Sequence, residues 1–321
     1  MFENIAVSFA IIIMKKISVV IPVYFNEKSL PHLFEKLLWL ESELLNKFDL
    51  HLELIFVDDG SGDNSLNELL NFKQSRPTTT IIKLTRNFGG IHAVKKGFQR
   101  VTGDCFMMLA ADLQDPPELI LELASKWIDG SKFIICERIS REDSWGSKLL
   151  SLIYYRVLRL IVVKDYPIGG YDLALMDQAF LPFLQNSSKS SFPPILAYWL
   201  GYKPEIILYH RNKRLHGKSR WTFRKKINTF LDVMLGFSVT PIRLISIFGF
   251  FVSFSSFIYG LTVVINTLLG SASQPGYASI AALITFLLGL TILMLGVIGE
   301  YLWRVFDEVN KRPEAVIEEI W

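Results

Sequence analysis

Short apolar runs alternate with segments of helical periodicity along the first 140 residues of the chain. The apolar runs are bounded by turn-forming residues, which predicts strands; they span residues 17–23, 52–57, 79–84, 105–109 and 132–136. Apolar positions spaced three or four residues apart predict helices, at residues 30–48, 65–72, 92–100 and 116–127. Strands alternating with helices predict an α/β domain with a mostly parallel sheet and helices on both faces.

Two much longer apolar stretches follow, at residues 242–269 and 277–302. Their only charged residues are Arg243 and Glu300. Each stretch exceeds the roughly 20 helical residues that cross a bilayer core. A pair of buried helices in a soluble core is the alternative, but ordinary helices are shorter and amphipathic. We therefore expect two membrane spans that form a hairpin.

The charges that flank these stretches predict a membrane topology. The segment HRNKRLHGKSRWTFRKK (210–226) is densely basic and has no acid, whereas the connector 270–276 is uncharged. Arg304, Lys311 and Arg312 follow the second stretch. Because basic residues stay on the cytoplasmic side, both flanks, both termini and the α/β domain are expected in the cytosol, at the inner (plasma) membrane.

The chain is expected to divide into five segments. Residues 1–14 are an extension of unassigned role, because they lack the basic start and cleavage site of a signal peptide. The other segments are the α/β domain (15–209), a basic loop with a juxtamembrane amphipathic helix at 222–235 (210–240), the hairpin (241–303) and a cytosolic tail (304–321). The basic segment lies against the membrane and no recognised nucleic-acid module is present, so nucleic-acid binding is not expected.

Polar clusters come directly after three expected strands, at residues 24–27, 58–61 and 112–115. Ligands of parallel sheets bind at the carboxyl ends of strands, so these clusters are candidate sites. Asp58 and Asp59 precede Gly-Ser, which is ordinary turn chemistry. Two adjacent acids nevertheless exceed what a turn needs, and one of them can accept hydrogen bonds from a nucleobase imide or a ribose.

The stretch LAADLQDPPE (109–118) supplies oxygen ligands. Asp112 and Gln114 are two residues apart, so in an extended segment both side chains point to the same side. Such oxygens suit Mg²⁺ or Mn²⁺, which complete their coordination with water and substrate phosphates. Asp115 precedes two prolines and is followed three positions later by Glu118, so we expect it to cap a helix.

Five motifs follow one another along the α/β domain: PVYFNEKSL (22–30), VDDGSGDNS (57–65), LTRNFGG (84–90), the pair Gly-Asp at 103–104 and ADLQDPPE (111–118). In these motifs the chain resembles glycosyltransferase family 2. More narrowly, it resembles the polyprenol-phosphate glycosyltransferases, which include bactoprenol glucosyltransferases and dolichol-phosphate mannose synthases. The resemblance covers about residues 15–313, and the hairpin matches the bacterial glucosyltransferase branch. It implies a GT-A fold that binds a nucleotide-sugar, often UDP-linked, with a divalent metal.

The resemblance also implies roles for individual residues. Nucleotide binding would fall to Pro22, Tyr24, Glu27, Asp58, Asp59 and Asp112. Asp112 would also be the metal ligand, with Gln114 beside it. Ala110 stands where the family usually has the first Asp of a D-x-D pair, which implies a thinner metal site. Asp172, in YPIGGYDLALMD (166–177), aligns with the family's catalytic Asp, although a helix N-cap explains it from the residues alone.

Basic residues are the candidates for binding a diphosphate or the acceptor phosphate. Arg214, Ser219 and Arg220 match the family's R-x-x-G-x-[ST]-K-Y loop, with Arg for Lys and Trp for Tyr. A positive-inside flank also explains them. Upstream, the residues that precede an expected helix at 149–162 match the acceptor-phosphate region, although a peripheral membrane helix explains them nearly as well; they are Arg138, Arg141 and Lys148.

The function implied by the resemblance is an inverting membrane enzyme. It would move a single sugar, most commonly glucose, from a UDP-sugar to polyprenyl (undecaprenyl) phosphate on the cytosolic face, for cell-surface glycans. A processive polysaccharide synthase is one alternative, but Gly217 replaces the Gln of Q-x-x-R-W and two spans are too few for a polymer channel. An inactive lipid- or complex-binding scaffold is the other, supported only by Ala110. Apolar hairpins also pack together, so a homo-oligomer is compatible with the sequence.

Overall fold

A mixed sheet forms the centre of the α/β domain in the computed structural model, which describes residues 14–139, 145–189, 191–212, 223–269 and 276–321. Within those ranges the sheet has eight strands in the order β7-β5-β6-β4-β1-β2-β3-β8. The strands are β1 (Lys15–Val23), β2 (Leu50–Asp58), β3 (Thr80–Leu84), β4 (Cys105–Met108), β5 (Phe133–Arg138), β6 (Tyr171–Asp177), β7 (Glu205–Tyr209) and β8 (Ile317–Ile320).

Most neighbouring strands run parallel, as predicted. β1 pairs in parallel with both β2 and β4, β2 pairs in parallel with β3, and β5 pairs in parallel with β7. β6 is antiparallel to β4 and β5, and β8 is antiparallel to β3. The predicted fold class is therefore confirmed: a mostly parallel sheet with helices on both faces, followed by long apolar helices.

Helices cover both faces of the sheet because the buried strands are apolar on both sides. Along β2, Leu54 and Phe56 face one core, while Ile55 and Val57 face the other. The first core is covered by α1 (Leu30–Phe48), α2 (Ser65–Ser75) and α4 (Leu119–Ile128). The second is covered by α3 (Gly90–Phe98), α5 (Trp145–Ile161), α6 (Leu181–Gln185), which follows the 3₁₀ turn η1 (Gln178–Phe180), α7 (Pro193–Trp199) and α8 (Phe223–Phe237).

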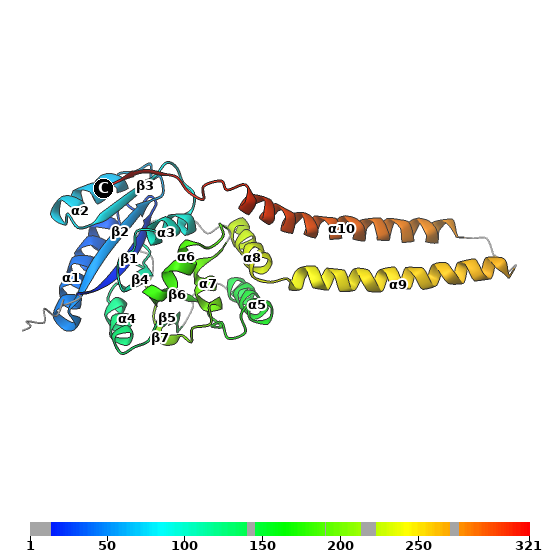
Figure 1. Cartoon of the computed structure of the whole chain (residues 1–321), viewed down its shortest axis with the longest axis horizontal. Helices are drawn as coiled ribbons and strands as arrows, with labels where there is room; N and C mark the ends of the chain where they lie inside the picture. Colours follow the sequence, from blue (N-terminus) through cyan, green and yellow to red (C-terminus); the bar gives the residue numbers. More distant parts are fainter. Residues whose placement is uncertain (1–13, 140–144, 190, 213–222, 270–275) are drawn as a thin grey trace, which may run out of the picture.

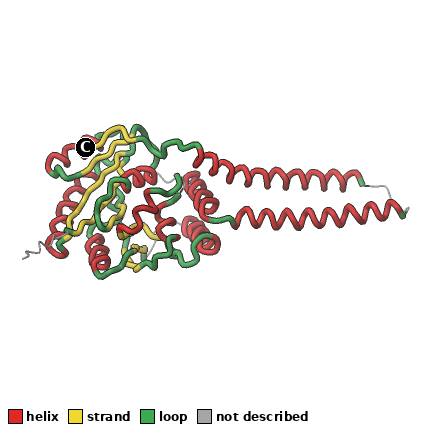
Figure 2. The backbone as a smooth tube through the Cα atoms, viewed as in Figure 1, coloured by secondary structure: helices red, strands yellow, loops and turns green. Residues whose placement is uncertain are grey.

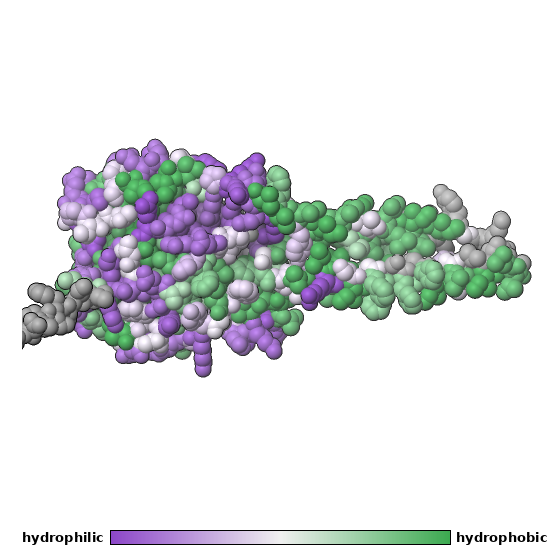
Figure 3. Space-filling model, viewed as in Figure 1, coloured by the Kyte–Doolittle hydropathy of each residue, from purple (hydrophilic) through white to green (hydrophobic). Residues whose placement is uncertain are grey.

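Two long helices, α9 (Thr240–Leu268) and α10 (Tyr277–Val309), project side by side from the α/β domain (Figures 1 and 2). Among the described residues, Thr240–Thr262 and Phe286–Val309 are long and apolar enough to cross a membrane. Their outward surface is apolar along nearly its whole length (Figure 3). At its base the hairpin is joined to α8, because Arg304 Nη2 lies 2.9 Å from Asp232 Oδ1.

The segment after α10 returns to the α/β domain, which the sequence analysis did not predict. Its last residues form β8, which adds an antiparallel edge strand to β3, and the C-terminus lies beside β3 and α2 (Figure 1). Ala315 is buried in the second core and Trp321 packs against the first. The expected cytosolic tail is therefore part of the sheet.

Candidate functional site

The candidate residues gather at one edge of the sheet. Parallel strands bring their carboxyl ends to the same edge, so the loops after β1, β2 and β4 are neighbours. β6 runs in the opposite direction, so its beginning lies at this edge: Tyr171 pairs with Glu137, near the end of β5. The register of β5 with β7 places Arg138 beside Tyr209. The sheet therefore assembles two groups of polar residues.

The first group lies in the loops after β1, β2 and β3 (residues 24–29, 59–64 and 85–89), which we call the amide-held loops. Backbone amides of one loop bond side chains of another: Asn64 N donates to Glu27 Oε2 at 3.1 Å, and Phe25 N donates to Ser61 Oγ at 3.1 Å. The predicted pocket residues that stay partly exposed here are Pro22, Tyr24 and Glu27.

The two adjacent acids at the end of β2 have different surroundings. Asp59 accepts from Phe88 N at 2.7 Å and from Gly89 N at 2.9 Å, so both of its oxygens hold the loop after β3. Asp58 Oδ2 accepts from Ser61 N at 3.2 Å, but its Oδ1 is buried without a hydrogen-bond partner among the described residues. Of the pair, Asp58 is thus the one with a buried oxygen whose hydrogen-bonding capacity is not used within the described ranges.

Burial raises the pKa of both carboxyls. For Asp58, the hydrogen bonds from Ser61 offset only part of the effect of burial. For Asp59, the amides of Phe88 and Gly89 do the same. A buried acceptor without a partner destabilises the fold, and a donor N–H from a ligand would remove that penalty.

A glycine allows the loops after β2 and β3 to approach each other. Gly60 has φ 68°, in the left-handed region. A Cβ at this position would lie 2.6 Å from the backbone carbon of Arg86, so the contact excludes any larger residue. This approach brings the RNFGG motif against the two acids, which explains why the two motifs occur together.

The loop after β4 carries the predicted metal ligands. Leu113 is buried and has φ 58°, so the segment curls and the extended conformation that we predicted is wrong. Gln114 N donates to Asp112 Oδ1 at 3.2 Å within this curl. In the described part of the chain, no group of three or more His, Cys, Asp or Glu residues could hold a metal.

Asp115 does not cap a helix, so that prediction is wrong. α4 begins at Leu119, and the amides of Leu119 and Ile120 bond the carbonyls of the two preceding prolines at 3.1 and 3.0 Å. Those bonds satisfy the first turn and leave Asp115 to point inward. It is 3% exposed, accepts from Tyr209 Oη at 2.7 Å and lies 2.9 Å from Arg211 Nε.

Asp172 also has a different setting from the helix cap that the residues alone allowed. It lies in strand β6, where Arg138 donates to both of its oxygens through Nε and Nη2. Tyr209 Oη donates to Oδ2 at 3.1 Å, and Arg211 Nη1 lies 3.7 Å from Oδ1. Together with Asp115 these residues form one arginine–aspartate cluster, composed of Asp115, Arg138, Asp172, Tyr209 and Arg211.

The two carboxyls of the cluster have opposite pKa shifts. Burial alone would raise the pKa of Asp172, but the hydrogen bonds and charge of Arg138 outweigh it and lower the pKa. At Asp115 burial prevails: Arg211 opposes it, the nearby charge of Asp172 adds to it, and the pKa is raised. Asp172 is therefore ionised and a weak base. The side chains of Arg138 and Arg211 are about one-fifth exposed (20% and 22%), so neither is fully enclosed by the cluster.

Other predicted phosphate-binding residues fall outside this cluster. Arg141, Arg214, Ser219 and Arg220 lie outside the described residues. Lys148 lies within α5 and does not precede it, because the helix begins at Trp145. The segment that carries the basic motif starts at the site, since Asn212 N donates to the carbonyl of Gln114 at 2.9 Å.

Sequence reasoning missed the part that Tyr209 and Arg211 have in the cluster. A signal was present: the two are separated by one residue at the end of an apolar strand, so their side chains point to the same side. Their contacts with Asp115 cross 94 and 96 residues of chain. The strand order β7-β5-β6-β4 brings them together.

Comparisons with known proteins agree with this arrangement. Residues 18–181 match the sequence profile described as Glycosyl transferase family 2. An uncharacterized glycosyltransferase from Synechocystis sp. is 36% identical over 309 residues, which are 95% of this chain and 96% of that protein. The putative glycosyltransferase CsbB of Bacillus subtilis is 32% identical over 304 residues, 94% of this chain and 91% of that one.

Solved structures are more distantly similar. The glucosyl-3-phosphoglycerate synthase of Mycobacterium tuberculosis has a TM-score of 0.47 and 16% identity, over 68% of this chain and 80% of that one. A mannosyltransferase from Pyrobaculum calidifontis, in complex with GDP-Man and Mn²⁺, has a TM-score of 0.43 and 16% identity, over 92% of this chain and 88% of that one. Similarities at this level carry no inference about substrate or metal.

Proposed function

This chain belongs to glycosyltransferase family 2, and from that premise we propose that it transfers a single sugar from a UDP-sugar to polyprenyl phosphate at the cytosolic face of the inner membrane. Glucose is the proposed sugar and undecaprenyl phosphate the proposed acceptor. The reaction inverts the anomeric centre: an acceptor phosphate oxygen attacks the anomeric carbon, and the bond to UDP breaks with its electron pair leaving on the diphosphate.

One observation carries this proposal: a series of contacts through α5 and α8 connects the strand that carries Asp172 to the base of the apolar hairpin. Gly170, two residues before Asp172, packs against Tyr155 of α5. The neighbouring ring of Tyr154 lies 5.7 Å from that of Phe230 in α8. Asp232 of α8 then pairs with Arg304 of α10. An anion-binding cluster next to membrane helices suits an acceptor whose phosphate sits at a lipid surface.

The amide-held loops are the proposed binding site for the nucleotide. Asp58 Oδ1 is a buried acceptor that matches the imide N–H of uracil, and Asp59 fixes the loop that packs beside it. Tyr24, Pro22 and Glu27 complete the proposed pocket. The buried acceptor gives a physical reason for a base with a ring N–H at that position.

Asp112 and Gln114 are the proposed holders of Mg²⁺ or Mn²⁺. A divalent cation supplies positive charge to the departing diphosphate. Because Ala110 gives no second carboxylate, the donor phosphates must provide much of the coordination, and metal and nucleotide are expected to bind together.

The arginine–aspartate cluster is proposed to orient the acceptor. The lipid phosphate is already ionised at neutral pH, so the reaction requires no strong base. Arg211, and the N–H groups of Arg138 that do not bond Asp172, can donate to its oxygens. The proposed role of Asp172 in the catalytic centre is to hold Arg138 in position.

The proposed topology follows from charge and from the shape of the chain. The described helices α9 and α10 leave the α/β domain together, and the segment after α10 returns to it (Figure 1). With the basic flanks inside, the sheet lies in the cytosol and the loop 270–276 lies outside.

Transfer to a lipid tests the proposal directly. The purified full-length protein, in lipid nanodiscs with Mg²⁺ or Mn²⁺, is incubated with undecaprenyl phosphate and a panel of radiolabelled UDP-sugars. With UDP-glucose and undecaprenyl phosphate we expect a labelled, acid-labile lipid. We expect no labelled lipid when undecaprenol is supplied in place of undecaprenyl phosphate. Equal labelling of undecaprenol, or labelling with no member of the panel, would overturn the proposed acceptor or donor respectively.

A further inference from the structure

The segment after α10 contacts the start of the loop at residues 85–89 and the helix α3 that follows the loop. At the start, Thr85 N donates to the carbonyl of Val316 at 3.1 Å, next to the pairing of β8 with β3. Beyond the loop, Glu314 Oε1 lies 2.9 Å from His92 Nδ1 in the first turn of α3 and 3.0 Å from Lys95 Nζ in its last turn. Residues 314–316 therefore contact the chain on either side of the loop.

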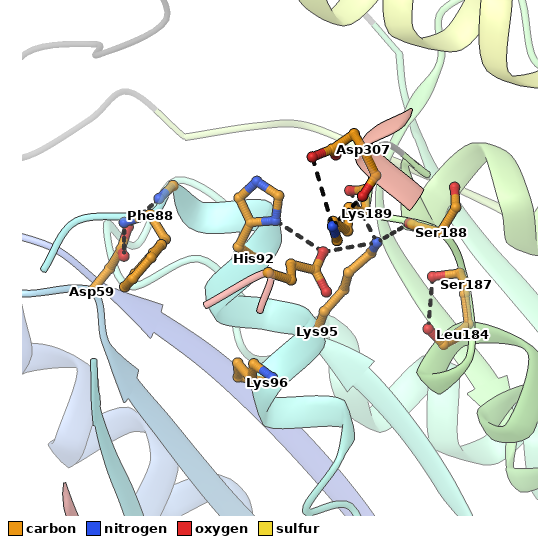
Figure 4. Close-up of polar contacts among 12 residues, drawn as sticks. Asp59, Phe88, His92, Lys95, Lys96, Leu184, Ser187, Ser188, Lys189 and Asp307 are labelled. Carbon is orange, nitrogen blue, oxygen red and sulfur yellow. Dashed lines mark hydrogen bonds and ion pairs between the residues drawn. The ribbon is translucent and has the colours of Figure 1, made fainter. Parts of the chain in front are cut away.

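The ion pair at the exit is built into the protein interior. Lys95 is 3% exposed, and its Nζ also donates to the carbonyls of Ser188 and Lys189 at 2.6 and 3.3 Å (Figure 4). The side chain of Glu314 is 14% exposed. Burial opposes its ionisation, but the hydrogen bond from His92 and the charge of Lys95 prevail and lower its pKa. A buried lysine needs such a partner, because burying an unpaired charge is costly.

A second contact ties the end of α10 to the same region. Lys189 Nζ donates to the carbonyl of Asp307 at 2.5 Å and lies 3.6 Å from its carboxylate (Figure 4). The position of α10 is thus linked to the segment beside Lys95. The hairpin, the tail and α3 form one connected set of contacts.

The end of the loop reaches the nucleotide side of the site. Phe88 N and Gly89 N donate to the two oxygens of Asp59, next to Asp58. The loop is therefore held by Val316 at its start and by Asp59 at its end, and Glu314 holds α3, which follows directly. Only Asp59 belongs to the motifs of the α/β domain.

We propose that Glu314 is a positioning residue for nucleotide binding, acting through α3 and the loop 85–89 on Asp59 and Asp58. This inference rests on the proposed function, because it assigns the loop to a UDP site. The tail is then a brace by which the membrane hairpin sets the geometry of the donor pocket. Without this contact the loop becomes more mobile and nucleotide binding becomes weaker, while the sheet and the acceptor side of the site keep their structure.

The test compares two substitutions in the same tail, made in the full-length protein in nanodiscs. Glu314→Gln removes the charge that faces Lys95 and His92. Glu318→Gln removes the same charge from β8, where Glu318 pairs with Lys83 of β3 at 2.9 Å and not with the residues of α3 that Glu314 contacts. Hydrogen exchange of residues 85–89 is measured without ligand, and UDP affinity is measured by calorimetry with Mn²⁺.

In Glu314→Gln we expect exchange in the loop to be about tenfold faster and the Kd for UDP about tenfold higher, the size of effect typical of one lost hydrogen bond to a charged group. Glu318→Gln should change neither by more than about twofold, as exposed ion pairs contribute little. A merely stabilising role predicts the opposite: a lower Tm with loop exchange and the Kd for UDP unchanged. That result, or equal changes in both variants, would overturn the proposal.

A double variant covers the case in which Glu314→Gln folds poorly. Lys95→Met with Glu314→Met removes both charges, and such apolar replacement is often tolerated. We expect near-normal Tm with faster exchange in the loop, since the brace is gone; protected amides would contradict the brace. If the wild type does not bind UDP, the proposed donor is wrong. Hydrogen exchange is measured without nucleotide, so the exchange rates of residues 85–89 in the variants still decide whether Glu314 holds the loop.

Discussion

The amide-held loops and the arginine–aspartate cluster lie at one edge of the same sheet, yet they hold their carboxylates by different means. In the loops, Asp58 and Asp59 receive backbone amides from segments close to them in the fold, and within the described ranges neither forms an ion pair with a lysine or arginine. In the cluster, Arg138 donates two hydrogen bonds to Asp172, and Arg211 pairs with Asp115. The first arrangement leaves one acceptor without a partner among those residues, whereas the second pairs each carboxylate with a guanidinium.

The difference shows in the protonation equilibria. Burial raises the pKa of Asp58 and Asp59, because amide bonds only partly replace lost water. Arg138 overcomes burial at Asp172 and lowers its pKa. A site for a neutral base and its N–H tolerates the first environment, while a site for an anion requires the second. We infer that the two regions divide donor and acceptor between them.

Asp112→Ala should have the largest effect. It removes the one carboxylate expected to hold the metal, so transfer should fall to background while Tm stays near that of the wild type, because Asp112 is only half-buried. Radiolabel transfer and thermal denaturation measure the two quantities. Ala110→Asp is the converse substitution, because it adds a second carboxylate. We expect the apo form of this variant to bind Mn²⁺ more tightly than the wild type does. Normal transfer by Asp112→Ala would exclude it as the ligand.

Asp172→Asn should lower kcat by roughly a hundredfold, an effect comparable with the loss of one positioned charge-stabilising group. The variant loses the negative charge that holds Arg138. Because Arg138 is proposed to orient the acceptor, the KM for the donor should change little. Asp177→Asn is the control, since Asp177 bonds Trp127 Nε1 and caps η1, away from the cluster. If both variants keep normal kcat, the cluster has no part in transfer.

Asp115→Asn separates the ion pair from helix capping. Asn and Asp are equally good N-caps, so a capping residue would tolerate the change. In the cluster the change leaves Arg211 without its nearest anion, and we expect a loss of about 1–3 kcal/mol in unfolding free energy, together with about tenfold in kcat. Thermal denaturation beside transfer kinetics decides it; an unchanged Tm would restore the capping role.

Asp58→Asn should change the stability of the fold only modestly, and in the opposite direction to Asp115→Asn. The native state holds a proton on Asp58 more tightly than the unfolded chain, so wild-type stability falls as pH rises from about 3.8 through the raised native pKa. At neutral pH the variant should gain about 1 kcal/mol by removing a buried charge. This gain should vanish in acid, where wild-type Asp58 is protonated. A loss of Tm at neutral pH would contradict the sign.

The parts of the fold that the sequence predicted are those written in local patterns. The β2 strand is apolar on both faces and ends at its acids, and α1 repeats leucines at 33, 37, 40 and 44, all of them buried. Each such pattern needs only neighbouring residues to be interpreted. β8 carries no such signal: the sequence IEEI stays largely exposed and becomes a strand only by pairing with β3, more than 230 residues earlier.

The candidate site divides in the same way. Asp58, Asp59 and Asp112 sit in turn motifs whose chemistry is visible in a few residues, and the structure brings their loops together. Asp115 was assigned to a cap because two prolines follow it, yet proline carbonyls satisfy the amides of α4 themselves. Its true partners lie on β7 and just beyond. Long-range ion pairs of this kind depend on strand order, which no local pattern encodes.

Calorimetric titration of UDP, with Mn²⁺, into Asp58→Asn and Asp172→Asn tests the division of the site most directly. The two variants make the same chemical change on opposite sides of one sheet edge. We predict that the Kd for UDP rises by about tenfold or more in Asp58→Asn, because one base-binding hydrogen bond to a charged group is lost, and stays within about twofold of the wild type in Asp172→Asn. Equal weakening in both variants, or weakening confined to Asp172→Asn, would contradict the account.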